Sequence, residues 1–228
     1  MSHAPVASAS VARGSLSRER VVAAALAIVD RDGLDGLSMR ALGRDLGVDP
    51  MAVYHWFPNK RALLQGVLEA VVRELPSHTG DLSSHTTWQQ VAIATARGLR
   101  ATLLAHPHAF AVVASQPVVT AGGLEVLERT AAELQRRGLT PRETITTINR
   151  LAELVVGACI TEVGTGPEGD DDEASIEEVV TPETLPTLAA AIADADPAED
   201  DWDARFERSL EIWILGLEAW FRRERRRR

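Results

Sequence analysis

The sequence predicts an all-α protein with a small N-terminal domain and a larger C-terminal domain. Apolar residues recur at spacings of three and four through most of the chain, which is the periodicity of amphipathic helices. Ser, Thr, Asp or Asn precedes several of these segments, as helix caps do, and no segment reads convincingly as a strand. The 228 residues, 45% of them hydrophobic, suffice for one large domain or two smaller ones.

The composition narrows the class of protein. No run of about 18 apolar residues occurs, so we expect no membrane span and no membrane partner. Residues 1–16 are small and polar and lack the features of a signal peptide, and we expect a disordered arm there. The single cysteine, Cys159, excludes an internal disulfide and fits a cytoplasmic protein.

The net charge of −9 argues at first against a nucleic-acid partner. The distribution of charge removes this objection, because no Lys or Arg occurs between Arg150 and Arg205, where Asp and Glu are frequent. Residues 13–75 hold nine basic and eight acidic residues. Phosphate binding depends on local cations, so an acidic C-terminal half does not exclude DNA binding by the N-terminal half.

The N-terminal domain is expected to span residues 17–75. A helix at about 17–31 has apolar residues on one face, and Gly33 is expected to end it. Two short helices follow, and a longer one begins after Asn59, carries apolar residues from 63 to 75 and is expected to stop at Pro76. Three helices followed by a connecting helix are therefore expected in this part of the chain.

The two short helices form a predicted helix-turn-helix. Ser38 is expected to cap the first, and Gly47 stands where a helix ends with a positive φ. Asp49 caps the second, and Pro50 takes its first position, where the missing N–H costs nothing. A short helix braced by another is a common way to enter the DNA major groove.

These residues resemble the DNA-binding domain of the tetracycline-repressor (TetR) family. The run RVVAAALAIVDRDGLDGLSMRALGRDLGVDPMAVYHWFPNKRALLQGVLE matches the first four helices of that domain in order and spacing. Its most specific part extends from Gly47-Val48 through Tyr54 to Asn59-Lys60-Arg61. The likeness continues more faintly to the C-terminus, so the resemblance implies a DNA-binding domain joined to a helical ligand-binding and dimerisation domain.

The resemblance implies a set of DNA contacts on three helices, with those of the reading helix on its second to seventh residues. Tyr54 is expected to contact a phosphate and Arg40 a guanine. The alternatives are that Tyr54 and Trp56 are core aromatics and that Arg40 is a solvated surface residue. Lys60 stands at a helix N-terminus, where a cation is unfavourable unless an anion such as phosphate lies nearby. The full predicted set is Ser38, Arg40, Pro50, Met51, Ala52, Tyr54, His55 and Lys60.

The C-terminal domain, residues 76–228, is expected to contain several longer helices. One runs from 88 to about 105 after a capping box formed by Thr87 and Gln90. Another ends at Gly138, and a third, at about 141–162, begins with the capping box of Thr140 and Glu143. A mobile acidic loop at 164–180 and helices at about 182–195 and 201–223 complete the prediction.

The resemblance also suggests where an effector binds. The histidines that hold magnesium and tetracycline in the family are replaced here by Pro76 and by Val112 or Val113, so we expect no metal, no cofactor and no magnesium–tetracycline complex. The expected effector is a largely apolar small molecule. Glu153 is expected to contact the effector; the alternative is that it forms a structural ion pair with Arg150 or Arg97. The predicted pocket residues are Thr95, Leu99, Leu103, Phe110, Val113, Gln116, Asn149 and Glu153.

A homodimer is expected through the helices at 141–162 and 201–222. The last helix carries a wide aromatic and aliphatic stripe, and such stripes are enriched in interface cores. The alternative is that the whole stripe lies in the core of one monomer. The predicted dimerisation residues are Ile148, Val155, Phe206, Leu210, Trp213, Leu217 and Trp220.

These expectations combine into a ligand-responsive transcriptional regulator, a repressor that binds a palindromic operator as a dimer. No nucleophile–base pair or metal triad stands out, so an enzyme is not expected. The pair His106 and His108 is a possible metal site, but a His-Pro turn that ends a helix is preferred. The alternatives to the repressor are a ligand-independent DNA-binding regulator and an enzyme on the same fold.

Overall fold

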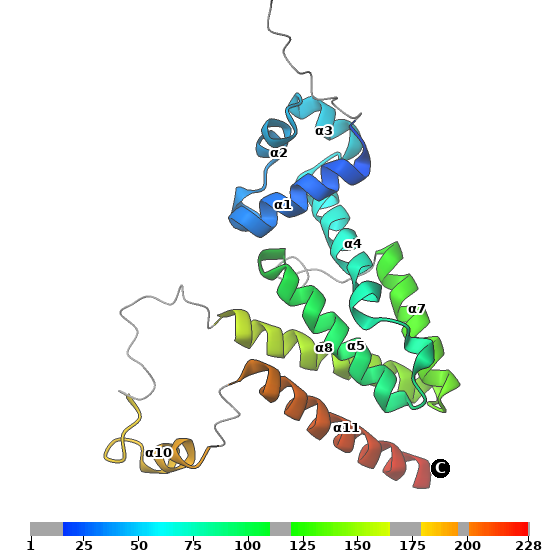
Figure 1. Ribbon diagram of the computed structural model, residues 1–228, viewed down its shortest axis with the longest axis vertical. Coiled ribbons are helices and arrows are strands. Elements are labelled where there is room, and N and C mark those ends of the chain that lie inside the picture. The colour runs from blue at the N-terminus through cyan, green and yellow to red at the C-terminus, as the bar shows by residue number, and fades with distance from the viewer. Residues whose placement is uncertain (1–15, 110–119, 165–178, 196–200, 228) are drawn as a thin grey trace, which may run out of the picture.

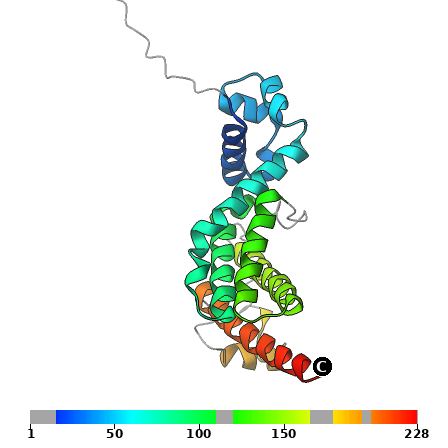
Figure 2. The same ribbon diagram turned by 90° about the vertical axis from the view of Figure 1, so that its right-hand side faces the viewer.

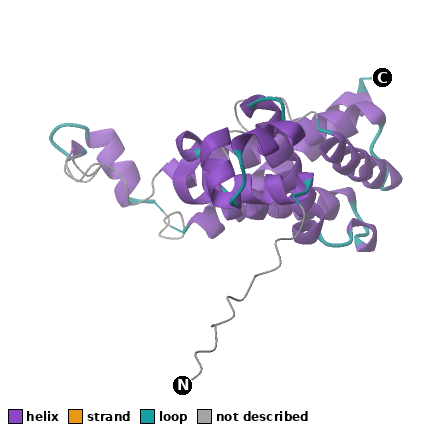
Figure 3. Cartoon of the chain, turned by 90° about the horizontal axis from the view of Figure 1, so that it is seen from above, coloured by secondary structure: helices purple, strands orange, loops and turns teal. Residues whose placement is uncertain are grey.

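The computed structural model describes residues 16–109, 120–164, 179–195 and 201–227. All regular structure in these ranges is helical, as Figure 3 shows, so the predicted all-α class is confirmed. The arm at 1–16, apart from Leu16, and most of the predicted loop at 164–180 lie outside the described residues. The same holds for the predicted pocket residues Phe110, Val113 and Gln116.

The N-terminal domain lies at one end of the molecule and the C-terminus at the other (Figure 1). It consists of α1 (Arg18–Gly36), α2 (Met39–Leu46) and α3 (Pro50–Trp56). Their apolar faces share one core with the first turns of α4 (Lys60–Thr79), which continues into the second domain. Figure 2 shows α4 as the helix that joins the two parts.

Local hydrogen bonds define the starts of these helices. The side chain of Ser38 accepts a hydrogen bond from the backbone of Ala41 at 3.0 Å, and that of Asn59 accepts one from Ala62 at 2.9 Å. Ser17 and Asp49 cap α1 and α3 in the same way. Each cap satisfies an N–H that the helix itself cannot, which is why the sequence places the starts correctly.

The predicted end of α4 at Pro76 is wrong. The helix continues through Pro76 to Thr79, and Gly80, at φ +65°, ends it by donating to the Pro76 carbonyl at 3.2 Å. Packing compensates for the hydrogen bond that proline cannot make, because the last turn of α4 lies directly on α5 (Trp88–Ala105). A Cβ atom on Gly98 of α5 would lie only 2.4 Å from Cγ2 of Thr79.

In the second domain, α5 and α7 (Ala121–Arg136) pack on the lower part of α4, and α8 (Pro141–Gly164) packs on α5 and α7. The helix α11 (Trp202–Arg226) lies beside α8 (Figures 1 and 2). Its core combines side chains from α5, α8 and α11, among them Val91, Leu151 and Phe206. The capping boxes predicted at Thr87 and Thr140 are both present.

The helix predicted at 182–195 begins later than expected. Residues 181–184 form a turn closed by a hydrogen bond from Leu185 to the Thr181 carbonyl at 2.8 Å, and α10 spans Pro186–Ala193. The hydroxyls of Thr181 and Thr184 bond to each other at 3.0 Å, which favours the turn over a helix. None of the residues of α10 is buried, and it stands apart from the other helices in Figure 1.

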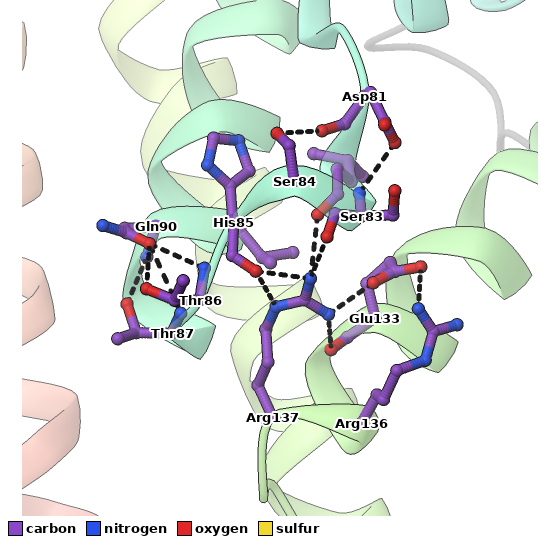
Figure 4. Close-up of polar contacts among 12 residues, drawn as sticks. Asp81, Ser83, Ser84, His85, Thr86, Thr87, Gln90, Glu133, Arg136 and Arg137 are labelled. Atoms are coloured by element: carbon purple, nitrogen blue, oxygen red, sulfur yellow. Dashed lines mark hydrogen bonds and ion pairs between the residues drawn. The ribbon is translucent and has the colours of Figure 1, made fainter.

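Arg137, just after α7, fixes the connection between α4 and α5 (Figure 4). This connection contains η1 (Leu82–Ser84), and the Arg137 guanidinium donates to the carbonyls of Leu82, Ser83 and His85 at 2.6–3.1 Å. The same guanidinium pairs with the carboxylate of Glu133. Because Arg137 is nearly buried, these contacts hold the start of α5 at a defined position on α7.

Candidate DNA interface and effector cavity

The turn between α2 and α3 depends on two glycines. Gly47 adopts φ +67°, and the next residue, Val48, donates a backbone hydrogen bond to the Gly43 carbonyl at 2.9 Å. A Cβ on Gly43 would lie 3.1 Å from the Val48 carbonyl oxygen and 3.2 Å from Pro50 Cα. Gly43 therefore lets the turn close tightly on α2, a role that our reasoning from the sequence missed.

The helix α3 buries one side and exposes the other. Val53 and the following Phe57 are buried in the domain core, whereas the side chains of Met51, Tyr54 and Trp56 are 72%, 43% and 36% exposed. The alternative that Tyr54 and Trp56 are core aromatics is therefore wrong. His55 is also exposed, and its ring lies 5.6 Å from that of Trp56 in an edge-to-face arrangement. Pro50 and Ala52 are half-buried on the same helix.

Ser38 and Arg40 lie at the start of α2, where both are exposed. The Ser38 hydroxyl already accepts a hydrogen bond as the N-cap, but it keeps a hydrogen to donate to a phosphate. Contacts of these two residues with DNA remain predictions, as do those of Pro50, Met51, Ala52, Tyr54 and His55.

Lys60 has a partner within the protein. Its Nζ donates to the carbonyl oxygen of Leu34, near the C-terminal end of α1, at 2.9 Å. Leu34 follows the break in α1 at Gly33, so its carbonyl gives the ammonium one neutral acceptor inside the protein, and the expected anionic partner stays a prediction. The side chain is exposed and retains two N–H donors, so a phosphate contact stays a prediction.

An apolar cavity of about 180 Å³ lies between α4, α5, α7 and α8. Within the described part of the chain, no charged, imidazole or amide side chain lines this cavity. Thr95 and Thr147 line it, but their hydroxyls donate to the carbonyls of Val91 and Glu143 at 2.8 Å. The lining residues are Val72, Leu75, Ala92, Thr95, Leu99, Leu103, Gly123, Leu127, Thr130, Leu134, Thr147, Ile148, Leu151, Ala152 and Val156.

The structure brings only part of the predicted pocket together. Thr95, Leu99 and Leu103 of α5 line the cavity. Asn149 and Glu153 do not point inward, because both are exposed on the opposite side of α8. Glu153 instead pairs with Arg150 at 2.5 Å, which is the alternative stated for it. The missed wall residues, such as Val72 and Ala152, are small or aliphatic, and apolar periodicity does not distinguish a cavity wall from a filled core.

Most of the predicted dimerisation residues belong to the core of the protomer. Val155, Phe206, Leu210 and Leu217 are buried there, because α11 packs one face against α5 and α8 of its own chain. Ile148 and Trp213 are partly buried against the same core. The outward apolar side chains of α8 and α11 are Ile145, Ile160, Val163, Ile212, Leu215 and Trp220, of which only Trp220 was predicted.

Cys159 and His108 have structural contacts. Cys159 is fully buried, and burial raises the pKa of its thiol to about 11, so it behaves as a core residue. Nδ1 of His108 donates to the Asp30 carbonyl at 2.9 Å, and His106 lies between two carboxylates. No cluster of metal-ligating side chains occurs within the described ranges, and no helix there is long and apolar enough to cross a membrane.

Most of the chain is similar to known regulators. Residues 21–67 match the family described as bacterial regulatory proteins, tetR family, and residues 82–221 match the tetracyclin repressor-like C-terminal domain. The tetracycline repressor protein class A of Escherichia coli is 30% identical over 205 residues, which cover 89% of this chain and 90% of the relative. The chain therefore belongs to the TetR family.

Two further relatives come from Streptomyces. The repressor DrrR1 of Streptomyces coeruleorubidus is 34% identical over 146 residues, which span 63% of this chain and about half, 53%, of that protein. The structure of the TetR family protein ActR from Streptomyces coelicolor in complex with actinorhodin has a TM-score of 0.74 and 26% identity. It covers 90% of this chain and 98% of ActR.

Proposed function

We propose that this protein is a dimeric transcriptional repressor that binds a palindromic DNA operator and releases it when a small molecule enters the cavity. The course of α4 carries this proposal. The helix begins at Lys60 beside the DNA-binding elements and lines the cavity with Val72 and Leu75. A ligand that displaces this part of α4 changes the position of α2 and α3. We place such an operator-binding protein in the cytoplasm.

The dimer places one α3 on each half-site of the operator. The outward aliphatic residues of α8 and α11 supply the interface, because exposed apolar residues gathered on two adjacent helices are unfavourable in water. Two-fold protein symmetry then matches two-fold operator symmetry, with the half-sites about 34–36 Å apart.

Selection of binding sites from random DNA tests the operator. We expect enrichment of an inverted repeat, and footprinting should show protection of both halves. Recovery of no enriched sequence, or of a single half-site without a repeat, would contradict the proposal.

The proposed effector is a largely apolar molecule. Of the three threonines in the wall, Thr95 and Thr147 donate their hydroxyl hydrogens to carbonyls of their own helices, and most of the other lining residues are aliphatic. The cavity is smaller than the roughly 300–1,000 Å³ of drug-sized ligand sites, so a large ligand requires wall residues to move. ActR, a relative of similar fold, has been solved with actinorhodin, which makes an organic effector a reasonable expectation here.

The residues that line this cavity do not suit a magnesium–tetracycline complex. Magnesium prefers oxygen ligands in octahedral geometry, and the cavity presents methyl and methylene groups instead. A gel-shift titration of the operator complex with tetracycline and magnesium should leave the complex intact. Release of the DNA at micromolar drug would refute this part of the proposal.

Two alternatives make different predictions. A ligand-independent regulator needs no cavity, and the apolar cavity between α4, α5, α7 and α8 favours a sensor. An enzyme needs acid–base groups at its pocket, and the described cavity walls supply none, so we propose no catalytic activity. An organic compound that binds the protein without releasing its operator would favour the first alternative.

A further inference from the structure

The N-terminal domain meets the C-terminal domain at a polar contact formed by three helices. His106, which caps the C-terminus of α5, places its Nδ1 2.9 Å from Asp30 Oδ2 of α1. Its Nε2 lies 3.1 Å from Glu74 Oε2 of α4. The His106 side chain is only 13% exposed. We call these three residues, Asp30, Glu74 and His106, the His106 bridge.

The geometry of the bridge identifies the protonation state that forms it. An ionised carboxylate only accepts hydrogen bonds, so each ring nitrogen of His106 must carry a hydrogen to bond its partner. Only the imidazolium has both hydrogens. In the neutral ring, one nitrogen lone pair would face a carboxylate oxygen, and one of the two contacts would become repulsive.

The surroundings make the bridge depend on this positive charge. Asp30 Oδ1 is buried and, within the described part of the chain, has no hydrogen-bond partner. A carboxylate so placed is costly unless a cation compensates it. The residues that follow His106 also contact the N-terminal domain. His108 donates to the Asp30 carbonyl of α1, and Ala109 is buried in the core of the N-terminal domain.

We propose that His106 is a positioning residue for DNA binding, whose imidazolium holds the N-terminal domain at a fixed orientation on the effector domain. This rests on the proposed function, because two recognition helices must keep a set separation to bind two half-sites. Loss of the proton releases the bridge and lets the two domains move relative to each other. DNA binding thereby becomes sensitive to protons as well as to the effector.

The expected direction of the pH dependence follows from the bridge. Burial alone lowers the pKa of His106, but hydrogen bonds to Glu74 and Asp30 and the charges of both raise it above its ordinary value of 6.5. A raised pKa means that the stabilisation is complete below about 6.5 and is lost as the pH rises through the folded-state pKa. Among the described residues, Asp30 and Glu74 are the charged groups that face the ring, and His108 contacts only the Asp30 carbonyl.

Distances between the two N-terminal domains of the dimer test this proposal without an operator or effector. A spin label is attached to Ala27→Cys, an exposed position of α1, while the buried Cys159 stays unlabelled. Pulsed electron–electron double resonance then measures the distance between the labels on the two protomers. Operator affinity alone would not isolate His106, because His55 of α3 is itself a histidine that is predicted to contact DNA. The comparison uses wild type, His106→Gln, His106→Arg and the control His85→Gln.

In wild type and in His85→Gln we expect a narrow distance distribution at about pH 6. At about pH 9, which lies above the usual range of histidine pKa values, the distribution should be at least about twice as broad. His106→Gln should be broad at both values. His106→Arg keeps a permanent charge between the carboxylates and should be narrow at both. By NMR, the His106 ring should titrate above 6.5, and Glu74→Gln should lower that pKa.

Equal widths at both pH values in wild type would overturn the proposal, as would a narrow distribution in His106→Gln. A His106 pKa at or below 6.5 would also overturn it. A chain that gives no distance between domains because it is monomeric would contradict the dimer of the proposed function. The NMR titration of His106 still decides the bridge in that case, so the two failures are distinguishable.

Discussion

Replacing Glu143 with glutamine tests how α8 and α11 are held together. The Glu143 carboxylate accepts hydrogen bonds from Nε and Nη2 of Arg225 at 2.7 and 2.8 Å. It also accepts from the backbone N–H and the hydroxyl of Thr140 at 2.8 and 2.9 Å, which completes the capping box. Its side chain is 8% exposed. Glutamine keeps the shape but loses the charge and one acceptor oxygen.

The structure sets the magnitude of this loss. The ion pair with Arg225 lowers the pKa of Glu143 from 4.5 to about 2, against the opposing effect of burial and with help from Thr140. That difference corresponds to about 3 kcal/mol, at roughly 1.4 kcal/mol per pH unit. The guanidinium of Arg225 is 56% exposed, so solvent screens part of it, and we expect Glu143→Gln to lose about 1–3 kcal/mol at pH 7.

The matched control is Glu153→Gln on the same helix. Glu153 also pairs with an arginine, Arg150, at 2.5 Å, but both side chains are 57% exposed. Exposed pairs contribute about 0–1 kcal/mol, so Glu153→Gln should resemble wild type. Urea unfolding at one fixed protein concentration measures both variants, because the stability of a dimer depends on concentration.

The pH dependence gives the same comparison a second readout. A depressed carboxyl pKa stabilises the fold above the unfolded value of 4.5, and this stabilisation is lost as the pH falls toward 2. The difference between wild type and Glu143→Gln should therefore shrink over this range. Equal losses of stability in the Glu143 and Glu153 variants at pH 7, or a difference that does not depend on pH, would refute the reasoning.

Four other variants test the fold, the DNA contacts and the proposed dimer. Gly98→Ala should destabilise the protein by about 1–3 kcal/mol in urea, although Ala favours helices, because its Cβ would lie 2.4 Å from Thr79 Cγ2. In gel shifts, Arg40→Ala should cost roughly 1–3 kcal/mol and relax preference at one base, whereas Lys60→Ala should weaken all DNA binding and flatten its salt dependence. Ile212→Glu should convert the proposed dimer to a species near 24.7 kDa by light scattering, and an unchanged mass would contradict the proposed interface.

The sequence alone determined where most helices begin and which apolar face of most of them is shielded from water. Thr87 and Gln90 cap α5 through hydrogen bonds that span three residues, so a short stretch of sequence contains both partners. The turn at Gly47 and the cap at Asp49 are local in the same sense. The helix-turn-helix could therefore be predicted, and with it the exposed positions of Arg40 and Met51.

The sequence did not determine what covers each apolar face. Val155 and Leu210 were assigned to a partner chain, yet they fill the core of their own protomer. Periodicity shows that a residue is shielded from water, but the hydrophobic effect has no direction and does not specify the neighbour. For the same reason a cavity wall such as Val72 has the same pattern as a filled core.

Only the tertiary structure decided the contacts between distant residues. The helix α4 passes through Pro76 because its last turn packs against Gly98 of α5, which outweighs a local preference to stop. His106 meets Asp30, which lies 76 residues earlier in the chain, and Glu74 on a third helix. No local pattern contains such a meeting, because it arises only when the packing of α1, α4 and α5 brings three polar side chains to one point.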